Sequence, residues 1–407
     1  MPPQLSPNFH EAEISRHSVR PADRVCRVQS RITPCADNRD RTILHPTPMV
    51  ALYTILAGGY DVFIAAYTFD TATSSLTLTA KYPSGTNPSW ISAHPTNHSI
   101  LYATNELNPA GQLQSFDIAK GNVLSAPVDT VPSGGGDPAF CVPLDTGEVA
   151  IMSYSGGNGR IIPTTSSPDT FNNGAPVITF PPPAGGVSHP HMALQHGKEV
   201  FVPDLGADTI WRLSPGGTPG VYSITGQIPQ PKGSGPRHGR LSKNRLYTLH
   251  ELSSTLSVQT IPSYPNGTST TISTVSIIPS NPPTTAVWAA GEILIPPPTA
   301  RFPREYIYVS NRNTGTQTPE GDSIAIFENV DKGTARERLQ LVKQVFTGLD
   351  QIRGMEFSPD GAFLVAGGVA GTAGIVVYER VDGGRGLREV VRNTEIPTRT
   401  SFVWKAL

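Results

Sequence analysis

The sequence is poor in charged residues, which occupy 15% of its 407 positions, against about a quarter in an average soluble domain. Lysine and arginine (31) nearly balance aspartate and glutamate (32), so the formal net charge is −1. A protein that binds nucleic acid or an anionic membrane usually carries a basic excess or a basic stripe. The composition therefore argues against both kinds of partner.

Cysteine and long apolar runs are also scarce. Cys26, Cys35 and Cys141 are too few and too scattered for a disulfide framework or a zinc site. No apolar run approaches the roughly 18 residues that span a bilayer, and the N-terminus lacks the hydrophobic core of a secretory signal. We therefore expect a cytoplasmic protein in which Cys141 is a small buried apolar side chain.

No helical period of 3.6 residues is sustained, whereas Gly (39) and Pro (40) make up about a fifth of the chain. Hydrophobic residues (37%) in short runs can still form a core, so the composition favours an all-β fold with many turns. Residues 1–48 differ, with seven arginines, no lysine and no strand period. They are expected to be a disordered extension; a transit peptide is the alternative, which Glu11, Glu13 and Asp23 disfavour.

One apolar, β-prone segment recurs seven times at intervals of 46 to 61 residues. Its copies are TILAGGY (54–60), ILYATNE (100–106), EVAIMSY (148–154), EVFVPDL (199–205), RLYTLHE (245–251), YIYVSNR (306–312) and FLVAGGV (363–369). A strand that opens with Pro or Gly, such as PHMAL (190–194) or GEILIP (291–296), precedes most copies; a third strand and a weaker fourth follow.

Four short antiparallel strands repeated seven times predict a seven-bladed β-propeller over residues 49–407, as one domain. A pair of β-sandwiches would not repeat one hairpin seven times. The first blade lacks its first strand, and the C-terminal segment TSFVWKAL (400–407) is expected to supply it. Ring closure by this C-terminal strand would remove open sheet edges.

Polar residues fall at equivalent places in this repeat. In a propeller the first strand of each blade lines the channel and the second returns antiparallel to it, so first-strand starts and second-strand ends share one mouth. First strands begin with His191, Arg237 and Arg353, and second strands end with Glu106, Asp204, Glu251 and Arg312. Convergence of both signs of charge predicts a pocket for a small anionic or carbonyl-bearing molecule. Salt bridges between blades are the alternative interpretation.

Three pairs of segments resemble the seven-bladed propeller lactonases: SHPHMAL with EVFVPDLGADTIW (188–211), GSGPRHGRL with RLYTLHELSSTLSV (233–258), and YIYVSNRN with DSIAIFE (306–328). IRGMEFSPDGAFLVAGG (352–368) is similar to the last blade of that family. The family includes 6-phosphogluconolactonase-like proteins and fungal 3-carboxy-cis,cis-muconate lactonizing enzymes. The resemblance covers residues 52–407; PPPTARFPRE (296–305) and GGVAGTAG (367–374) depart from the family pattern.

The resemblance implies four catalytic residues, His191, Arg237, Glu251 and Arg312, and no metal or organic cofactor. Arg353, Glu106, Asp204, His189 and His238 are expected to bind substrate. A calcium site built from oxygen ligands at this mouth, namely Glu106, Asn105, Asp204, Glu251 and Asn311, is a less favoured alternative because arginines would repel the cation.

The expected activity is hydrolysis of a small anionic sugar-type lactone in carbohydrate metabolism, by a metal-independent monomer. Glu251 or His191 would activate water, and Arg237 and Arg312 would stabilise the developing oxyanion. A muconate cycloisomerase, which would use the same arginines to bind carboxylates, is the first alternative. A non-catalytic propeller scaffold is the second.

Overall fold

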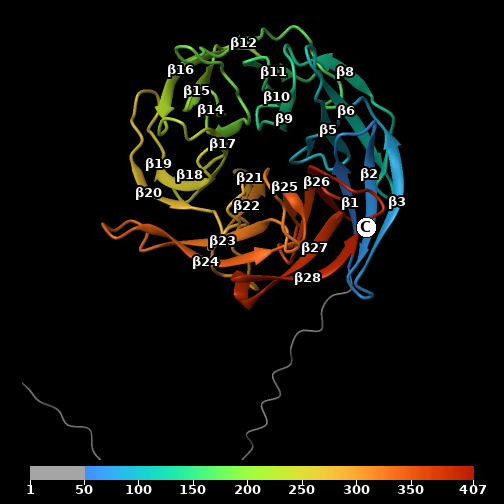
Figure 1. Ribbon diagram of the computed structural model, residues 1–407. Helices are drawn as coiled ribbons and strands as arrows, with labels where there is room; N and C mark the ends of the chain where they lie inside the picture. The colour runs from blue at the N-terminus through green and yellow to red at the C-terminus, as the bar shows by residue number, and fades with distance from the viewer. Residues whose placement is uncertain (1–50) are drawn as a thin grey trace, which may run out of the picture. The chain divides into compact units, whose positions relative to one another are not determined.

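The computed structural model describes residues 51–407, and most of these residues lie in β-strands. Seven antiparallel sheets are arranged in a ring (Figure 1), which confirms the seven-bladed β-propeller that the repeat predicts. The extension expected over residues 1–48, with Cys26 and Cys35, lies outside the described residues. Cys141 is buried, as expected of a small apolar side chain.

Each blade is described from its inner strand outward. Blade 1 contains β29 (Ser401–Ala406), β1 (Leu52–Gly58), β2 (Phe63–Asp70) and β3 (Ser75–Pro83). Blade 2 contains β4 (Ile91–Ala93), β5 (Ile100–Asn105), β6 (Gln112–Ala119), β7 (Val123–Leu124) and β8 (Asp129–Pro132). Blade 3 contains β9 (Pro138–Pro143), β10 (Glu148–Ser153), β11 (Asn158–Pro163) and β12 (Ile178–Thr179).

The remaining four blades follow the same order. Blade 4 contains β13 (Leu194–His196), β14 (Glu199–Asp204), β15 (Thr209–Pro215) and β16 (Tyr222–Pro229). Blade 5 contains β17 (Pro236–Ser242), β18 (Arg245–His250), β19 (Thr255–Thr260) and β20 (Thr271–Ser276). Blade 6 contains β21 (Trp288–Leu294), β22 (Ile307–Asn313), β23 (Ser323–Val330) and β24 (Arg338–Phe346). Blade 7 contains β25 (Asp350–Phe357), β26 (Phe363–Ala370), β27 (Ile375–Val381) and β28 (Gly386–Asn393), with a 3₁₀ turn η1 (Asp382–Gly384) before β28.

The C-terminal strand closes the ring, as the sequence predicts. β29 pairs antiparallel with β1, from Ser401 opposite Gly58 to Ala406 opposite Tyr53, and Figure 1 places the C-terminus in this blade. The indole of Trp404 packs edge-on against Tyr53, with ring centroids 5.4 Å apart. Backbone pairing and aromatic packing therefore join the two ends of the propeller.

The core lies between the blades rather than within them. Seven clusters of buried apolar side chains each combine residues of two neighbouring blades, so every seam of the ring has one. At the closing seam, Ile55 and Tyr67 of blade 1 pack with Val365 and Val377 of blade 7. Because both of their faces are covered, second strands such as β5 and β14 are buried at every position.

Two strands differ locally from the sequence prediction. The first strand of blade 4, expected at 190–194, begins only at Leu194, and Pro190 joins Asp204 through an isolated bridge. Proline lacks the N–H that a ladder needs, although the N–H of His191 still donates to the carbonyl of Pro203 at 2.9 Å. The outer strand of blade 2 is divided into β7 and β8, with Pro127 between them.

Replacement of Trp404 tests how much the closing strand stabilises the ring. Trp404→Ala should lower the free energy of unfolding by about 3–5 kcal/mol, the usual cost of removing a buried aromatic side chain, as measured by denaturant titration. Leu407→Ala, at an exposed position of the same segment, should change it by less than about 0.5 kcal/mol. Equal stability of the two variants would contradict the importance of this seam.

Candidate functional site

The mouth of the propeller, where the inner strands begin, brings three of the predicted residues into direct contact. Glu251, which follows β18, accepts from Nη1 of Arg237 at 2.5 Å and lies 2.8 Å from Nη2 of Arg312. Nε of Arg237 donates to the carbonyl of Gly291 at 2.9 Å, and Nε of Arg312 donates to that of Ala290 at 3.1 Å. Both guanidiniums are therefore fixed by the same carboxylate and by β21.

This contact determines the charge state of Glu251. Burial raises the pKa of its carboxyl, but Arg237 and Arg312 outweigh burial and hold the pKa at about 2. Burial and the charge of Arg237 in turn lower the pKa of Arg312 to about 10. Glu251 is thus ionised at neutral pH and a poor proton acceptor, and its two contacts fix the orientation of the arginines.

A second group at the mouth crosses the closing seam. Arg353 of β25 in blade 7 lies 3.7 Å from Oε1 of Glu106, which follows β5 in blade 2. The hydroxyl of Tyr60, from blade 1, is 3.0 Å from both oxygens of Glu106, and Arg353 lies over the Tyr60 ring at 5.5 Å. Sequence reasoning missed Tyr60, although it ends a repeat copy (TILAGGY) as Glu106 and Glu251 do.

His191 lies at the same mouth with its ring almost fully buried. Its Nδ1 is 3.2 Å from Nε2 of His238. Burial lowers the pKa of His191 well below its usual value, and the charges of Arg237, Arg353 and Arg312 lower it further. The imidazole is therefore neutral at physiological pH, with one ring nitrogen able to accept a proton.

His189 and Tyr154 form one wall beside His191. The rings of His189 and Tyr154 are stacked, with centroids 4.2 Å apart, and Nδ1 of His189 is 2.9 Å from the Tyr154 carbonyl. Tyr154 also faces the ring of His191 edge-on at 5.9 Å. Tyr154 ends the copy EVAIMSY, so a search of strand ends for uncharged polar residues would have found it.

His238 was expected to bind substrate, but the structure encloses it completely. Its ring packs edge-on against Trp90 and Phe140, with centroids 5.3 and 5.6 Å apart. Nδ1 of His238 lies 3.0 Å from Oε2 of Glu292, which is also buried. His238 therefore contacts His191 from behind the mouth, and Glu292 belongs to the same network although it was not singled out in the sequence.

Asp204 does not join the residues of the mouth. Its carboxylate is fully buried, and its two oxygens accept hydrogen bonds from residues of blade 4 and the preceding segment. The donors are the hydroxyl of Ser188 (2.5 Å), the backbone N–H groups of His189 (2.7 Å), Gly206 (3.1 Å) and Ala207 (3.0 Å), and the indole of Trp211 (2.8 Å). The expectation that Asp204 binds substrate is corrected: its acceptor capacity is used to shape the turn after β14.

The proposed calcium ligands are likewise engaged elsewhere. The amide of Asn311 donates to the carbonyl of Ile277 and to Ser323, and Glu251 is held by two arginines. Among residues 51–407, no group of three His, Cys, Asp or Glu side chains is arranged to hold a metal ion. Over the same residues, no helix is long and apolar enough to cross a membrane.

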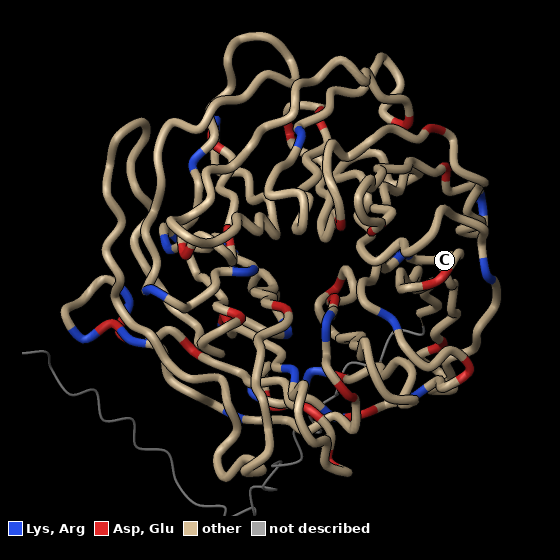
Figure 2. The backbone as a smooth tube through the Cα atoms, turned by 45° about the horizontal axis from the view of Figure 1, so that its top comes forward, with Lys and Arg blue, Asp and Glu red and all other residues tan. Residues whose placement is uncertain are grey.

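A cavity of about 480 Å³ lies further along the inner strands, toward the opposite end of the channel. Its lining is largely apolar, with Trp90, Phe140 and Trp404, and its charged groups are Arg240 and Glu356. Burial raises the pKa of Glu356 to about 7. In Figure 2 most residues have the tan colour of uncharged types, and some Lys or Arg and Asp or Glu residues lie close to the centre of the ring. We place the candidate site at the mouth because it holds three arginines, two carboxylates and a neutral histidine together.

Comparison with known families agrees with the fold. Residues 51–404 match the family described as lactonase, 7-bladed beta-propeller. The match covers most of the chain, and the chain belongs to this lactonase family, as the resemblance of its repeat motifs indicates. No curated protein matches the chain significantly.

Solved structures show the same fold at low sequence identity. A protein from Bacteroides fragilis, provisionally named a 6-phosphogluconolactonase, is 21% identical with a TM-score of 0.73, over 88% of this chain and 99% of that chain. The periplasmic gluconolactonase of Pseudomonas aeruginosa is 20% identical with a TM-score of 0.71, over 87% of this chain and 99% of that chain. A protein from Lactobacillus plantarum is 22% identical with a TM-score of 0.73, over 87% and 99% of the two chains.

The structural role of Asp204 can be tested by replacing its carboxylate with an amide. Asp204→Asn replaces one acceptor oxygen with a donor and should lower the free energy of unfolding by about 1–3 kcal/mol, since buried donors lose their partner. Denaturant titration measures the change. Asp145→Asn, at an exposed position, is the matched control and should be within about 0.5 kcal/mol of the original protein. A stable Asp204→Asn protein would return Asp204 to the list of ligand-binding candidates.

Proposed function

We propose that the mouth hydrolyses a small sugar-type lactone that carries an anionic group, in the manner of a 6-phosphogluconolactonase. The observation that carries the proposal is the buried imidazole of His191 at the same mouth as three guanidiniums, since burial and then their charges lower its pKa. Three arginines (237, 312 and 353) face two glutamates (251 and 106), so the mouth retains one positive charge in excess. Such a site supplies a base and an anion-binding surface together.

Hydrolysis needs a proton acceptor and a stabilised oxyanion. His191 takes a proton from water as the water oxygen bonds to the lactone carbonyl carbon, whose oxygen becomes negatively charged. Arg237 and Arg312 stabilise that oxygen, since Nη2 of Arg237 and Nη1 of Arg312 make no other hydrogen bond within residues 51–407. The ring C–O bond then breaks, and the leaving alkoxide takes the proton from His191 to give the hydroxy acid.

Arg353 is suited to bind the anionic group of the substrate. Its contact with Glu106 is long (3.7 Å), whereas Arg237 and Arg312 are held within 2.8 Å of Glu251. A guanidinium with one weak carboxylate partner keeps several donors for a carboxylate or phosphate. We therefore assign charge recognition to Arg353 and oxyanion stabilisation to the other two arginines.

Charge states at the mouth favour hydrolysis over cycloisomerisation. A cycloisomerase must protonate a carbon, and the sequence offered Glu251 or His191 as the acid. The pKa of Glu251 is about 2 and that of His191 is well below its usual value, so at neutral pH Glu251 is a carboxylate and His191 is a neutral imidazole rather than an imidazolium. Neither residue therefore has a proton ready for transfer to carbon, whereas the neutral ring of His191 has a free nitrogen that can accept a proton from water.

The function can be tested with purified protein and three kinds of substrate. We expect acid release from 6-phosphogluconolactone, and more slowly from uncharged aldonolactones, measured by pH-stat above the spontaneous rate. We expect no loss of ultraviolet absorbance from 3-carboxymuconate. Arg237→Ala should lower kcat/KM for the lactone by about 100- to 1,000-fold, the usual cost of losing an oxyanion donor.

Arg245→Ala is the matched control for Arg237→Ala. Arg245 also forms two contacts with a glutamate, Glu337, at 2.8 and 2.6 Å, but it begins β18 at the end of the blade remote from Glu251. The Arg245→Ala variant should keep kcat/KM within about twofold of the original value while losing about as much stability as Arg237→Ala. Full activity of folded Arg237→Ala would refute its role, and consumption of carboxymuconate without lactone hydrolysis would refute the function.

The pH dependence of activity tests His191 as the base. A base is active when unprotonated, and the folded-state pKa of His191 lies well below the ordinary value of 6.5. Activity should therefore stay constant from pH 8 down to 6.5 and fall only at more acidic pH. The measurement is kcat/KM by pH-stat after subtraction of spontaneous hydrolysis. A half-maximal rate at pH 6.5, typical of an unperturbed histidine, would be inconsistent with the assignment.

A further inference from the structure

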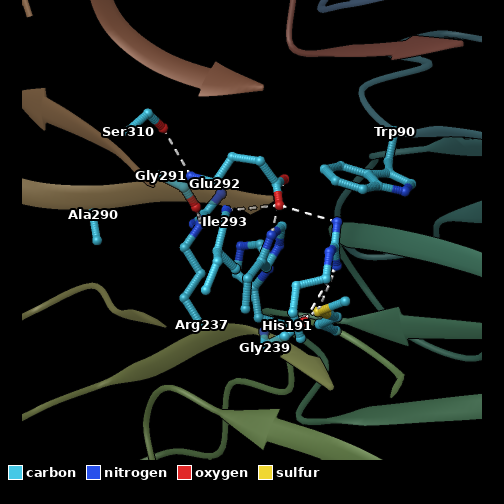
Figure 3. Close-up of polar contacts among 12 residues, drawn as sticks. Trp90, His191, Arg237, Gly239, Ala290, Gly291, Glu292, Ile293 and Ser310 are labelled. Carbon is cyan, nitrogen blue, oxygen red and sulfur yellow. Dashed lines mark hydrogen bonds and ion pairs between the residues drawn. The ribbon is translucent and has the colours of Figure 1, made fainter. Parts of the chain in front are cut away.

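Glu292 is a buried carboxylate that the hydrolytic steps above do not use. It is 1% exposed, and removing a carboxylate from water costs several kcal/mol unless charged or polar partners compensate. Oε2 of Glu292 lies 3.0 Å from Nδ1 of His238, while Oε1 lies 3.4 Å from Nη2 of Arg240 and accepts from the N–H of Ile293 at 2.9 Å. Figure 3 shows these contacts converging on the Glu292 carboxylate.

The charge of Glu292 locates the proton on His238. Burial raises the pKa of Glu292, but His238 and Arg240 outweigh burial and hold it below its usual value, so the carboxylate is ionised. The contact with Nδ1 of His238 is close but outside hydrogen-bond geometry, so its attraction is mainly electrostatic. A nitrogen lone pair at 3.0 Å from a carboxylate oxygen would be repelled, and Nδ1 therefore carries the proton.

The second nitrogen of His238, Nε2, then determines which ring nitrogen of His191 carries the proton. Burial keeps the pKa of His238 below its usual value despite Glu292, so the ring is neutral and its Nε2 is an acceptor. Nδ1 of His191, 3.2 Å away, can only be the donor. Because His191 is also neutral, its single proton is on Nδ1 and its Nε2 carries the free lone pair.

We propose that Glu292 and His238 are positioning residues that hold His191 in the Nδ1–H tautomer and so present its Nε2 to water at the mouth. The order Glu292, His238, His191 extends the carboxylate–histidine arrangement that orients a catalytic base by one further imidazole. The consequence for activity rests on the proposed function, since it requires His191 to be the base. The tautomer itself does not depend on that function.

A purely structural role for Glu292 makes a different prediction. Glu292 lies on β21 of blade 6, and Arg240 and His238 lie on β17 of blade 5, so the carboxylate also joins two blades. If that were its whole role, its loss would lower stability and leave the tautomer of His191 unchanged. A readout of ring protonation therefore separates the two roles.

The test is ¹⁵N NMR of histidine-labelled protein at pH 7, with His191 assigned from the signal lost in His191→Gln. We expect His191 and His238 both to be protonated on Nδ1. In Glu292→Gln the amide can donate to Nδ1 of His238, which moves the proton of His238 to Nε2 and that of His191 to Nε2 as well. Activity with 6-phosphogluconolactone should fall about 100-fold or more in kcat, as when a triad base is held in the wrong tautomer, with KM within about twofold.

Glu199→Gln is the matched control. Glu199 is also 1% exposed and is paired with Arg212 of its own blade at 2.8 and 2.7 Å, without contact to the mouth. It should lower stability without changing the His191 signal or kcat. If Glu292→Gln does not fold, the test uses His238→Gln and His238→Leu instead. The carbonyl of a glutamine at position 238 can still accept from Nδ1 of His191, whereas leucine cannot. Only His238→Leu should therefore allow His191 to lose its Nδ1–H tautomer.

Protonation of His191 on Nε2 in the original protein would overturn the proposal, as would an unchanged His191 tautomer in Glu292→Gln. The tautomer is measured without substrate. A protein that shows the expected tautomer but hydrolyses no lactone would therefore contradict the proposed function and leave the arrangement of Glu292, His238 and His191 intact.

Discussion

The pairing of β29 with β1 is the interaction on which the site depends. Arg353 is on blade 7, whereas Tyr60 and Glu106 are on blades 1 and 2, so the group they form exists only when the ring is closed. The closing segment also contacts blades 1 and 2 directly: Arg399 pairs with Asp61 of blade 1 at 2.8 Å, and Oγ of Ser401 accepts from the N–H of Ile91 of blade 2. Closure thus unites the fold and assembles one half of the mouth.

The scarcity of charge in this chain has an energetic meaning at the mouth. Burying an ionised group is costly unless another charge and further hydrogen bonds compensate, and here Glu251 is matched by two arginines that also donate to the carbonyls of β21. Burial keeps His191 neutral, and the positive charge of the same arginines adds to this effect. In the proposed mechanism one carboxylate therefore orients the two oxyanion donors, and the charge of those donors adds to burial in keeping the base unprotonated.

The fold could be predicted from sequence because a seven-fold repeat of apolar strands has few other solutions, and the rule of strand starts and ends brought Arg237, Glu251, Arg312, Arg353, Glu106 and His191 to one mouth. The same rule failed for Asp204, because a strand-end side chain can turn back to accept the donors of its own turn, which residue type does not reveal. The rule also could not decide whether Glu251 or His191 acts as the base. That choice depends on distances to Arg237 and Arg312, which only the folded blades determine.

The two departures from the family pattern fall at opposite ends of the propeller, and this bears on specificity. The proline-rich stretch 296–305 connects β21 to β22, so it follows the end of an inner strand and lies away from the mouth. GGVAGTAG (367–374) forms the end of β26 and its turn into β27, at the mouth itself. There a side chain on Gly368 would come within 2.2 Å of the Asp350 carbonyl, so the position excludes larger residues. Arg353, on the neighbouring strand β25, is the most exposed of the three arginines. The departure at the mouth thus lies beside the arginine that we propose to bind the substrate anion, whereas the departure at the far end lies away from the residues of the proposed mechanism.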